Sequence, residues 1–491
     1  MKKNIKSIFV ILTITLFLLN YTAIIAVPAA PPDGGGTGGA PGGNRGSANV
    51  SYNGATTISS DTNNSGSTYS SSTGSQNALL VSGGTSTLAN ITVTKSGDAS
   101  GDNADFYGTN AGVLAYNGAT LNINGGNIST NGSHANAVFA YGTGVINISD
   151  AAIKTSNNNS GAVMVTGGGK LTANNITATT DGNSSAPIRS DRGGGNLTVN
   201  GGEYTANGVG SPAIYSTADI TVNNSTLTST SSEGAVVEGK NSITLNNTNL
   251  TDTNTSLNGN SETYKNIFLY QSMSGDADEG TASFTANNST ITTNKGDTIF
   301  VTNTTATVSL ENNKIVNNDS TGAFLRIQTG KWGNSGSNGG NVTLNASNQE
   351  IIGDIYVDNI SSLDMKLTNN SNYSGTINGE NKAKNLSINL NSGSVLTLTS
   401  DSYITSLSNE LEDNSNINLN GHTLYVGNNA ITSTNYKEKT NDNAETSDIV
   451  NSGDNNITNK YVILIVICIV VVIIVLGIVI AIIKKTKNNV K

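Results

Sequence analysis

Five charged residues stand out as candidates for chemistry. They are Arg189, Asp191 and Arg192 in the segment IRSDRGGG, and Glu238 and Lys240 about two repeats later. A basic group beside carboxyls can serve as acid or base, and equivalent positions of successive repeats can share a face. However, the chain has no paired aspartate motif, and His134 is expected in a turn and His422 near the end of the repeats. The catalytic signal is therefore weak.

Two acidic segments bounded by glycine contain oxygen ligands of the kind that calcium prefers. The segment GDASGDNADFYG supplies Asp98, Asp102 and Asp105, and SGDADEG supplies Asp276, Asp278 and Glu279. Neither segment completes an EF-hand loop, so we favour solvated acidic loops. Calcium at Asp276, Asp278 and Glu279 is the alternative, and no cofactor is required.

A stripe of aromatic and charged residues is expected on the outside of strands that begin with alanine. One outward set comprises Pro187, Ile214, Val236, Phe268, Phe300 and Phe324, and the set beside it Arg189, Ser216, Glu238, Tyr270, Thr302 and Arg326. Trp332, the only tryptophan, follows in the insertion GKWGNSGSNGG and could lean over this face. Rings beside hydrogen-bonding groups suit sugars. We therefore expect an exposed ligand-binding stripe comprising Arg189, Glu238, Phe268, Tyr270, Arg326 and Trp332.

The elements that position these residues recur at a nearly constant period. Ala111, Ala137, Ala162, Ala186, Ala213 and Ala235 lead successive repeats, with gaps of 26, 25, 24, 27 and 22 residues. Such a period predicts a solenoid in which each repeat forms one coil. Within a coil we expect three short strands, with apolar residues inward, Thr and Asn outward, and Asn or Gly in the turns. The threonine columns of the third strands are expected to be interrupted at Lys154, Tyr204, Asp252 and Lys314.

These Ala-led, Asn-turn repeats resemble right-handed parallel β-helix proteins of the pectate-lyase-like superfamily. More narrowly, they are similar to adhesin-like surface proteins of Firmicutes and related prokaryotes. The resemblance covers about residues 50–428 and implies an all-β, right-handed parallel β-helix solenoid of about a dozen coils. It also implies an alternative activity, a cell-surface polysaccharide lyase or glycoside hydrolase, for which the five charged residues are the candidates. We predict that the chain is not an enzyme.

The two ends of the chain carry membrane-related signals. A basic start followed by an apolar run predicts a signal peptide, and Tyr461 to Ile483 is long and apolar enough to form a transmembrane helix. The Lys residues after this span place the C-terminus in the cytoplasm and the solenoid outside the cell. The predicted segments are a signal peptide (1–30), a Gly/Pro-rich flexible leader (31–49), the β-helix ectodomain (50–428), a disordered polar stalk (429–460), the transmembrane helix (461–483) and a basic cytoplasmic tail (484–491).

The net charge of the region between the two apolar runs limits the partners that the protein can bind. Seven lysines flank the two apolar runs, which leaves 18 basic against 34 acidic residues between them. Such an acidic region has no electrostatic attraction for nucleic acid. We therefore predict a single-pass cell-surface protein, adhesin-like or carbohydrate-binding, whose partners are the membrane and a glycan or a host or neighbouring cell. A structural surface spacer without a ligand is the further alternative.

Overall fold

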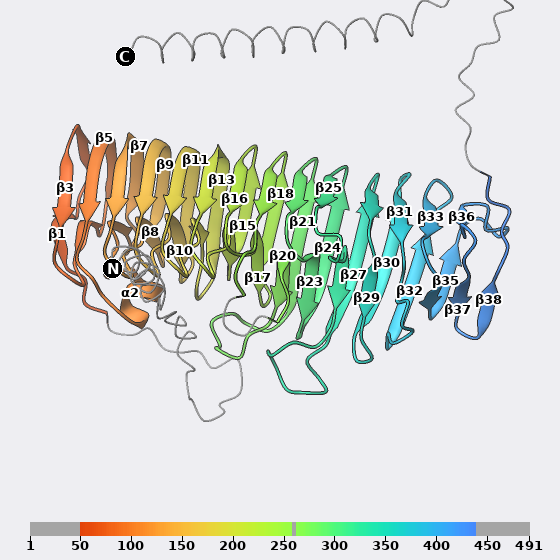
Figure 1. Ribbon diagram of the computed structural model, residues 1–491. Coiled ribbons are helices and arrows are strands. Elements are labelled where there is room, and N and C mark those ends of the chain that lie inside the picture. The colour runs from red at the N-terminus through yellow and green to blue at the C-terminus, as the bar shows by residue number, and fades with distance from the viewer. Residues whose placement is uncertain (1–49, 258–261, 438–491) are drawn as a thin grey trace, which may run out of the picture. The chain divides into compact units, whose positions relative to one another are not determined.

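The computed structural model describes residues 50–257 and 262–437. The described chain is an all-β parallel solenoid of about 15 turns, in which strands stack as rungs along one axis (Figure 1). The predicted signal peptide, leader, membrane span and tail, and most of the predicted stalk, lie outside the described residues. Within the described ranges, no helix has the length and apolar character that crossing a bilayer requires.

One strand of most coils belongs to a twelve-stranded sheet, here called sheet A. Its strands are β1 (Gly54–Ile58), β4 (Asn77–Val81), β6 (Val113–Ala115), β8 (Val138–Tyr141), β10 (Val163–Thr166), β12 (Ile188–Arg189), β14 (Ile214–Ser216), β17 (Ala235–Glu238), β20 (Lys265–Tyr270), β23 (Asp297–Thr302), β26 (Leu325–Ile327) and β29 (Ile355–Val357).

The remaining strands of each coil form sheet B and two small end sheets. Sheet B contains β2 (Thr62–Ser65), β3 (Thr68–Ser71), β5 (Thr85–Lys95), β7 (Thr120–Thr130), β9 (Val145–Thr155), β11 (Gly169–Thr180), β13 (Gly195–Ala206), β15 (Asp219–Asn223), β16 (Thr226–Ser229), β18 (Ser242–Asn246), β19 (Asn249–Asp252), β21 (Thr281–Asn287), β22 (Thr290–Thr293), β24 (Thr304–Glu311), β25 (Lys314–Asn317), β27 (Gly340–Ser347), β30 (Ser362–Thr368), β32 (Asn385–Leu390) and β35 (Ser406–Asn409). The end sheets contain β28 (Glu350–Ile352), β31 (Asn372–Gly375), β33 (Val395–Leu398) and β36 (Ile417–Asn418), and β34 (Ser402–Ile404), β37 (Leu424–Val426) and β38 (Asn429–Ile431).

Asparagine and glycine create the bend between the second and third strand of a coil, as predicted. Asn90, Asn175, Asn224 and Asn247 occupy this position with φ values of 51°, 53°, 52° and 49°. Asparagine tolerates this left-handed conformation better than most residues. Because the same turn recurs, the second and third strands of successive coils stay in parallel register.

The core is a set of aliphatic columns, one residue per coil. In sheet A, Ile188, Ile214, Ala235 and Ile267 pair in sequence and are fully buried. Ile214 therefore points inward, and the prediction that it faces outward is wrong. The reason is register: Ala235 pairs with Ile214 and not with Ala213, because this coil is one residue shorter than the alanine spacing indicates. Such a shift reverses the facing of a strand.

Three further expectations from the sequence change with the structure. Phe324, expected outside, is buried in the core. Tyr204 and Asp252, expected to interrupt the threonine columns, point inward and are completely buried. One outward column is therefore continuous over five coils, through Thr179, Thr205, Thr228, Thr251 and Thr292. The solenoid also exceeds the predicted dozen coils, because its last coils are led by residues other than alanine, such as Ile355 and Ser402.

Candidate functional site

The outer face of sheet A, the side turned away from the core, carries the candidate residues in two columns. The first runs through Met164, Arg189, Tyr215, Val236, Phe268, Phe300, Arg326 and Tyr356, paired coil by coil. The second contains Glu238, Tyr270 and Thr302. Sequence reasoning placed Arg189 and Arg326 in the column of Tyr270. The register places them in the column of Phe268 instead, which brings Tyr215 and Tyr356 into the site.

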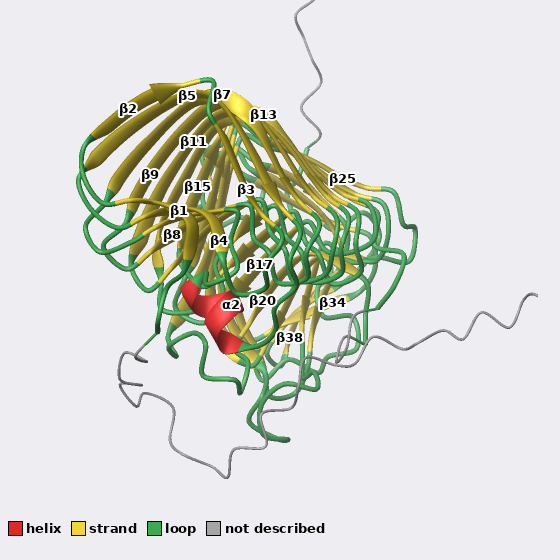
Figure 2. Ribbon diagram, turned by 90° about the vertical axis from the view of Figure 1, so that its left-hand side faces the viewer, coloured by secondary structure: helices red, strands yellow, loops and turns green. Residues whose placement is uncertain are grey.

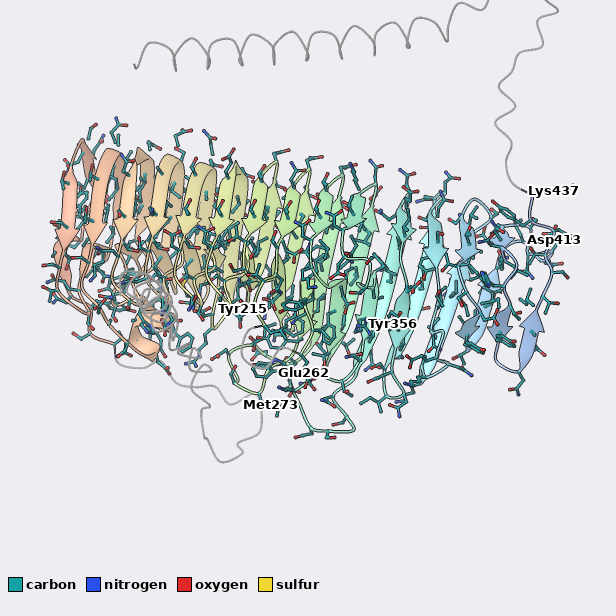
Figure 3. All side chains as sticks on the ribbon, viewed as in Figure 1. Tyr215, Glu262, Met273, Tyr356, Asp413 and Lys437 are labelled. Atoms are coloured by element: carbon teal, nitrogen blue, oxygen red, sulfur yellow. The ribbon has the colours of Figure 1, made fainter. Side chains whose placement is uncertain are left out.

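Long connections cover much of this outer face. All of them adjoin strands of sheet A: 96–112 with helix α2 (Asp102–Tyr107), the described residues 253–257 and 262–264, 271–280 and 328–339. Figure 2 shows α2 on the side formed by sheet A, and Figure 3 shows Glu262 and Met273 on loops that project below the body. Phe268 and Tyr270 are consequently only 7% and 6% exposed. The expectation that these two rings form an open stripe is wrong, since the connections fold over them.

Aromatic rings pack against one another under these connections. Phe268 stacks on Tyr270 at a centroid distance of 4.5 Å, and Trp332 reaches over Tyr270 at 5.4 Å. Trp332 therefore leans over this face, as its place in the insertion predicted. Tyr215 packs at the edge of the same cluster and, like Trp332, is only partly buried. These two rings form the accessible rim of the cluster.

Glu238 lies at the centre of this cluster and is 1% exposed. Its carboxylate accepts hydrogen bonds from the hydroxyls of Tyr215 and Ser272, and from Tyr270 Oη at 2.9 Å. Burial raises the pKa of the Glu238 carboxyl, and the hydroxyl donors oppose part of that rise. The sequence identified Glu238, but it gave no signal for Ser272, which lies in an irregular segment.

Two arginines on the same face are already bound to carboxylates. Arg189 forms a buried pair with Asp191, with Nη2 2.5 Å from Oδ2. Arg192 Nη2 lies 2.5 Å from Asp276 Oδ1, and its guanidinium lies 3.6 Å from the centre of the Phe106 ring on α2. Arg192 thereby joins the α2 connection to segment 271–280. The structure confirms that Arg189, Asp191 and Arg192 share the outer face with Glu238.

Further along the solenoid the outer face is more open. Arg326 Nε lies 2.6 Å from Asp297 Oδ2, and its guanidinium lies 4.4 Å from the centre of the Tyr356 ring. Beyond sheet A, Tyr403 on β34 and Tyr425 on β37 of the end sheet form a stacked pair with centroids 4.6 Å apart. This part of the face presents half-buried rings and one paired guanidinium to solvent.

The acidic segments proposed for calcium have other partners in the structure. Asp276 pairs with Arg192, and Asp278 Oδ2 lies 2.9 Å from Lys240 Nζ. Asp105 Oδ1 lies 2.7 Å from His134 Nδ1. Glu279 is exposed beside Asp278. Across residues 50–257 and 262–437, no group of three or more His, Cys, Asp and Glu side chains is placed to hold a metal ion.

No family model, no curated protein and no solved structure matches the chain.

Proposed function

We propose that the chain is an adhesin-like cell-surface protein that binds glycans through the outer face of sheet A. One observation carries the proposal: the outward-facing aromatic residues concentrate on this face. In contrast, the three aromatic residues of sheet B, Tyr69, Tyr204 and Phe284, all point into the core. Rings beside paired guanidinium and carboxylate groups are suited to stack on a sugar and bind its hydroxyls.

Charge supports a ligand that is not strongly anionic. The described residues contain 15 Lys and Arg against 28 Asp and Glu, a balance of 15 − 28 = −13. The three arginines of the described residues, Arg189, Arg192 and Arg326, all lie on the outer face, and each is paired with an aspartate. A uronate-rich chain would have to compete with these aspartates.

The proposal includes the cellular setting inferred from the sequence. The signal peptide exports the chain, and the span 461–483 anchors it with the right-handed β-helix outside the cell and the C-terminus in the cytoplasm. A relationship to the pectate-lyase-like superfamily and to adhesin-like proteins belongs to the same proposal. The membrane and a glycan or a neighbouring cell surface are the expected partners, without nucleic acid.

The direct test uses the full chain in detergent on a glycan array. We expect binding that falls at least tenfold in the variants Trp332→Ala and Tyr356→Ala, because both remove an accessible ring from the outer face. The matched control is Thr244→Ala on sheet B, which should bind like the wild type. Unchanged binding by both ring variants, or equal loss in the control, would refute the outer face as the binding surface.

A second candidate function, a polysaccharide-active enzyme, is favoured by Glu238 alone. A buried carboxyl with a raised pKa has the properties of a general acid. Incubation with pectic and neutral polysaccharides, with and without calcium, separates the two functions. Reducing or unsaturated ends that disappear in Glu238→Gln would establish the enzyme, whereas retention of the polysaccharide without product supports binding.

A further inference from the structure

Glu238 is a buried acid without a cationic partner. Among the described residues no lysine or arginine forms an ion pair with it, and its contacts are the hydroxyls of Tyr215, Tyr270 and Ser272. A buried carboxylate normally pairs with a cation, because removal from water is costly. Hydroxyl donors satisfy the hydrogen-bonding capacity of the oxygens, but they bring no positive charge.

The cations on this part of the outer face pair with other carboxylates: Lys240 with Asp278, and Lys265 with Glu233. Arg189 and Arg192 each have their own aspartate, Asp191 and Asp276. Asp276 raises the pKa of Glu238 further by its negative charge. These ion pairs are neutral as pairs, whereas Glu238 has no cation of its own. Its carboxylate therefore makes the centre of the outer face negative.

Aromatic rings enclose the same position. Tyr270 lies between Phe268 and Trp332, and Tyr215 Oη is 3.3 Å from Tyr270 Oη. Tyr215 and Tyr270 meet Glu238 through their hydroxyls, and the Tyr270 ring packs between Phe268 and Trp332. Lys265 Nζ already lies 4.5 Å from the centre of the Phe268 ring. An ammonium group at Glu238 would therefore gain from the carboxylate through charge-assisted hydrogen bonds. The same rings offer a surface on which a sugar can stack.

Segment 271–280 closes the site. Its Ser272 hydroxyl occupies one Glu238 oxygen, and Met273 on the same segment is 60% exposed. Gln271 is 93% buried under the segment, yet its Oε1 has no hydrogen-bond donor. A ligand with several donor groups would satisfy Gln271 Oε1 and replace Ser272 at Glu238.

The geometry points to an amino-sugar receptor: the Glu238 site takes the ammonium group of a sugar residue with a free amine, while the sugar ring lies against Trp332. Segment 271–280 moves aside and the ligand amine takes the place of the Ser272 hydroxyl. The inference rests on the proposed glycan-binding function and names its ligand class. A neutral N-acetylated sugar lacks the charge that Glu238 needs.

The test compares two oligomers that differ only in this group. Binding of a β-1,4-linked glucosamine tetramer and of its fully N-acetylated counterpart to the full chain in nanodiscs is measured by calorimetry near neutral pH. We expect the amine oligomer to bind at least tenfold more tightly. In Glu238→Gln the ratio should fall to about one, while the control Glu203→Gln, an exposed acid on sheet B, should retain it.

A second variant tests the inference independently, in case Glu238→Gln does not fold. Ser272→Ala removes the hydroxyl that competes for the carboxylate, so it should strengthen amine binding several-fold and leave neutral binding unchanged. Equal affinity of the two oligomers for the wild type, or a tenfold preference that survives Glu238→Gln, would overturn the inference. If neutral glycans still bind in a Trp332-dependent way, only the ligand class fails; if no glycan binds at all, the proposed function fails as well.

Discussion

The two outward surfaces of this solenoid differ although most coils contribute to both. On sheet B, one column reads Thr172, Thr198, Thr221, Thr244 and Thr285 in five successive coils. Over the same coils, the first outer column of sheet A reads Met164, Arg189, Tyr215, Val236 and Phe268. The stacking requirement is the same in both sheets. Repetition is therefore sufficient where a surface only has to stack, and it is lost on the outer face of sheet A.

Side-chain hydrogen bonds sharpen this contrast. On sheet B, Asn174, Asn200, Asn223, Asn246 and Asn287 form an amide ladder with bonds of 2.8 to 2.9 Å. Each amide is satisfied by its equivalent in the next coil. On the outer face of sheet A, by contrast, polar groups find partners in the inserted connections, as Glu238 does with Ser272. A coil can therefore change there without breaking a ladder.

The largest expected loss of stability comes from a substitution that disrupts the regular stacking of sheet B. Gly202 lies at a bend of sheet B with φ 99°, and a Cβ there would lie 2.2 Å from Ile176 O and 2.6 Å from Ile176 N. Gly202→Val should lower the free energy of unfolding by about 4 kcal/mol or more, because backbone must move in two coils. Chemical denaturation measures the loss. Gly194→Ala is the matched control, since nothing lies within 4 Å and only its φ of 69° adds strain; it should cost about 1 kcal/mol. Equal losses would contradict the tight stacking of sheet B.

The next effect compares one residue type in the two regions. Phe284 is buried inside sheet B, and Phe300 is buried on the outer face of sheet A. Phe284→Ala should cost about 4 kcal/mol, because the stacked coils cannot collapse around the cavity. Phe300→Ala should cost about 2 kcal/mol, since only connections cover it and they can relax into the gap. A larger loss for Phe300 would show that the outer cluster is as rigid as the core.

The smallest effect concerns a buried acid of sheet B, Asp252, for comparison with Glu238. Burial raises the pKa of Asp252 to about 7, above the value of about 3.9 expected in the unfolded chain. The folded state therefore holds an extra proton between about pH 4 and pH 7, and stability falls as pH rises through that window. Asp252→Asn should be nearly neutral at low pH and should stabilise the protein by about 2 kcal/mol near pH 8. Thermal unfolding across this pH range measures the difference, and a variant with the wild-type pH profile would contradict it.

The regular region could be predicted from the sequence far better than the irregular one. Asparagine turns, inward aliphatic residues and parallel coils follow from local patterns, and the structure confirms them. The facing of Ile214 could not be predicted, because one residue fewer between two coils reverses a strand without altering its composition. Trp332 was placed over the outer face by its position in an insertion. The burial of Phe268 and Tyr270 could not be foreseen, since it depends on how glycine-rich connections fold over the sheet.

The final strand has a consequence for assembly. β38 pairs with β37 in antiparallel orientation, whereas the pairings before it are parallel. The hydrogen-bonding edge that it presents is three residues long and runs against the winding of the coils. A chain that arrives at this edge meets a short strand of reversed direction, which disfavours a further parallel rung on β37.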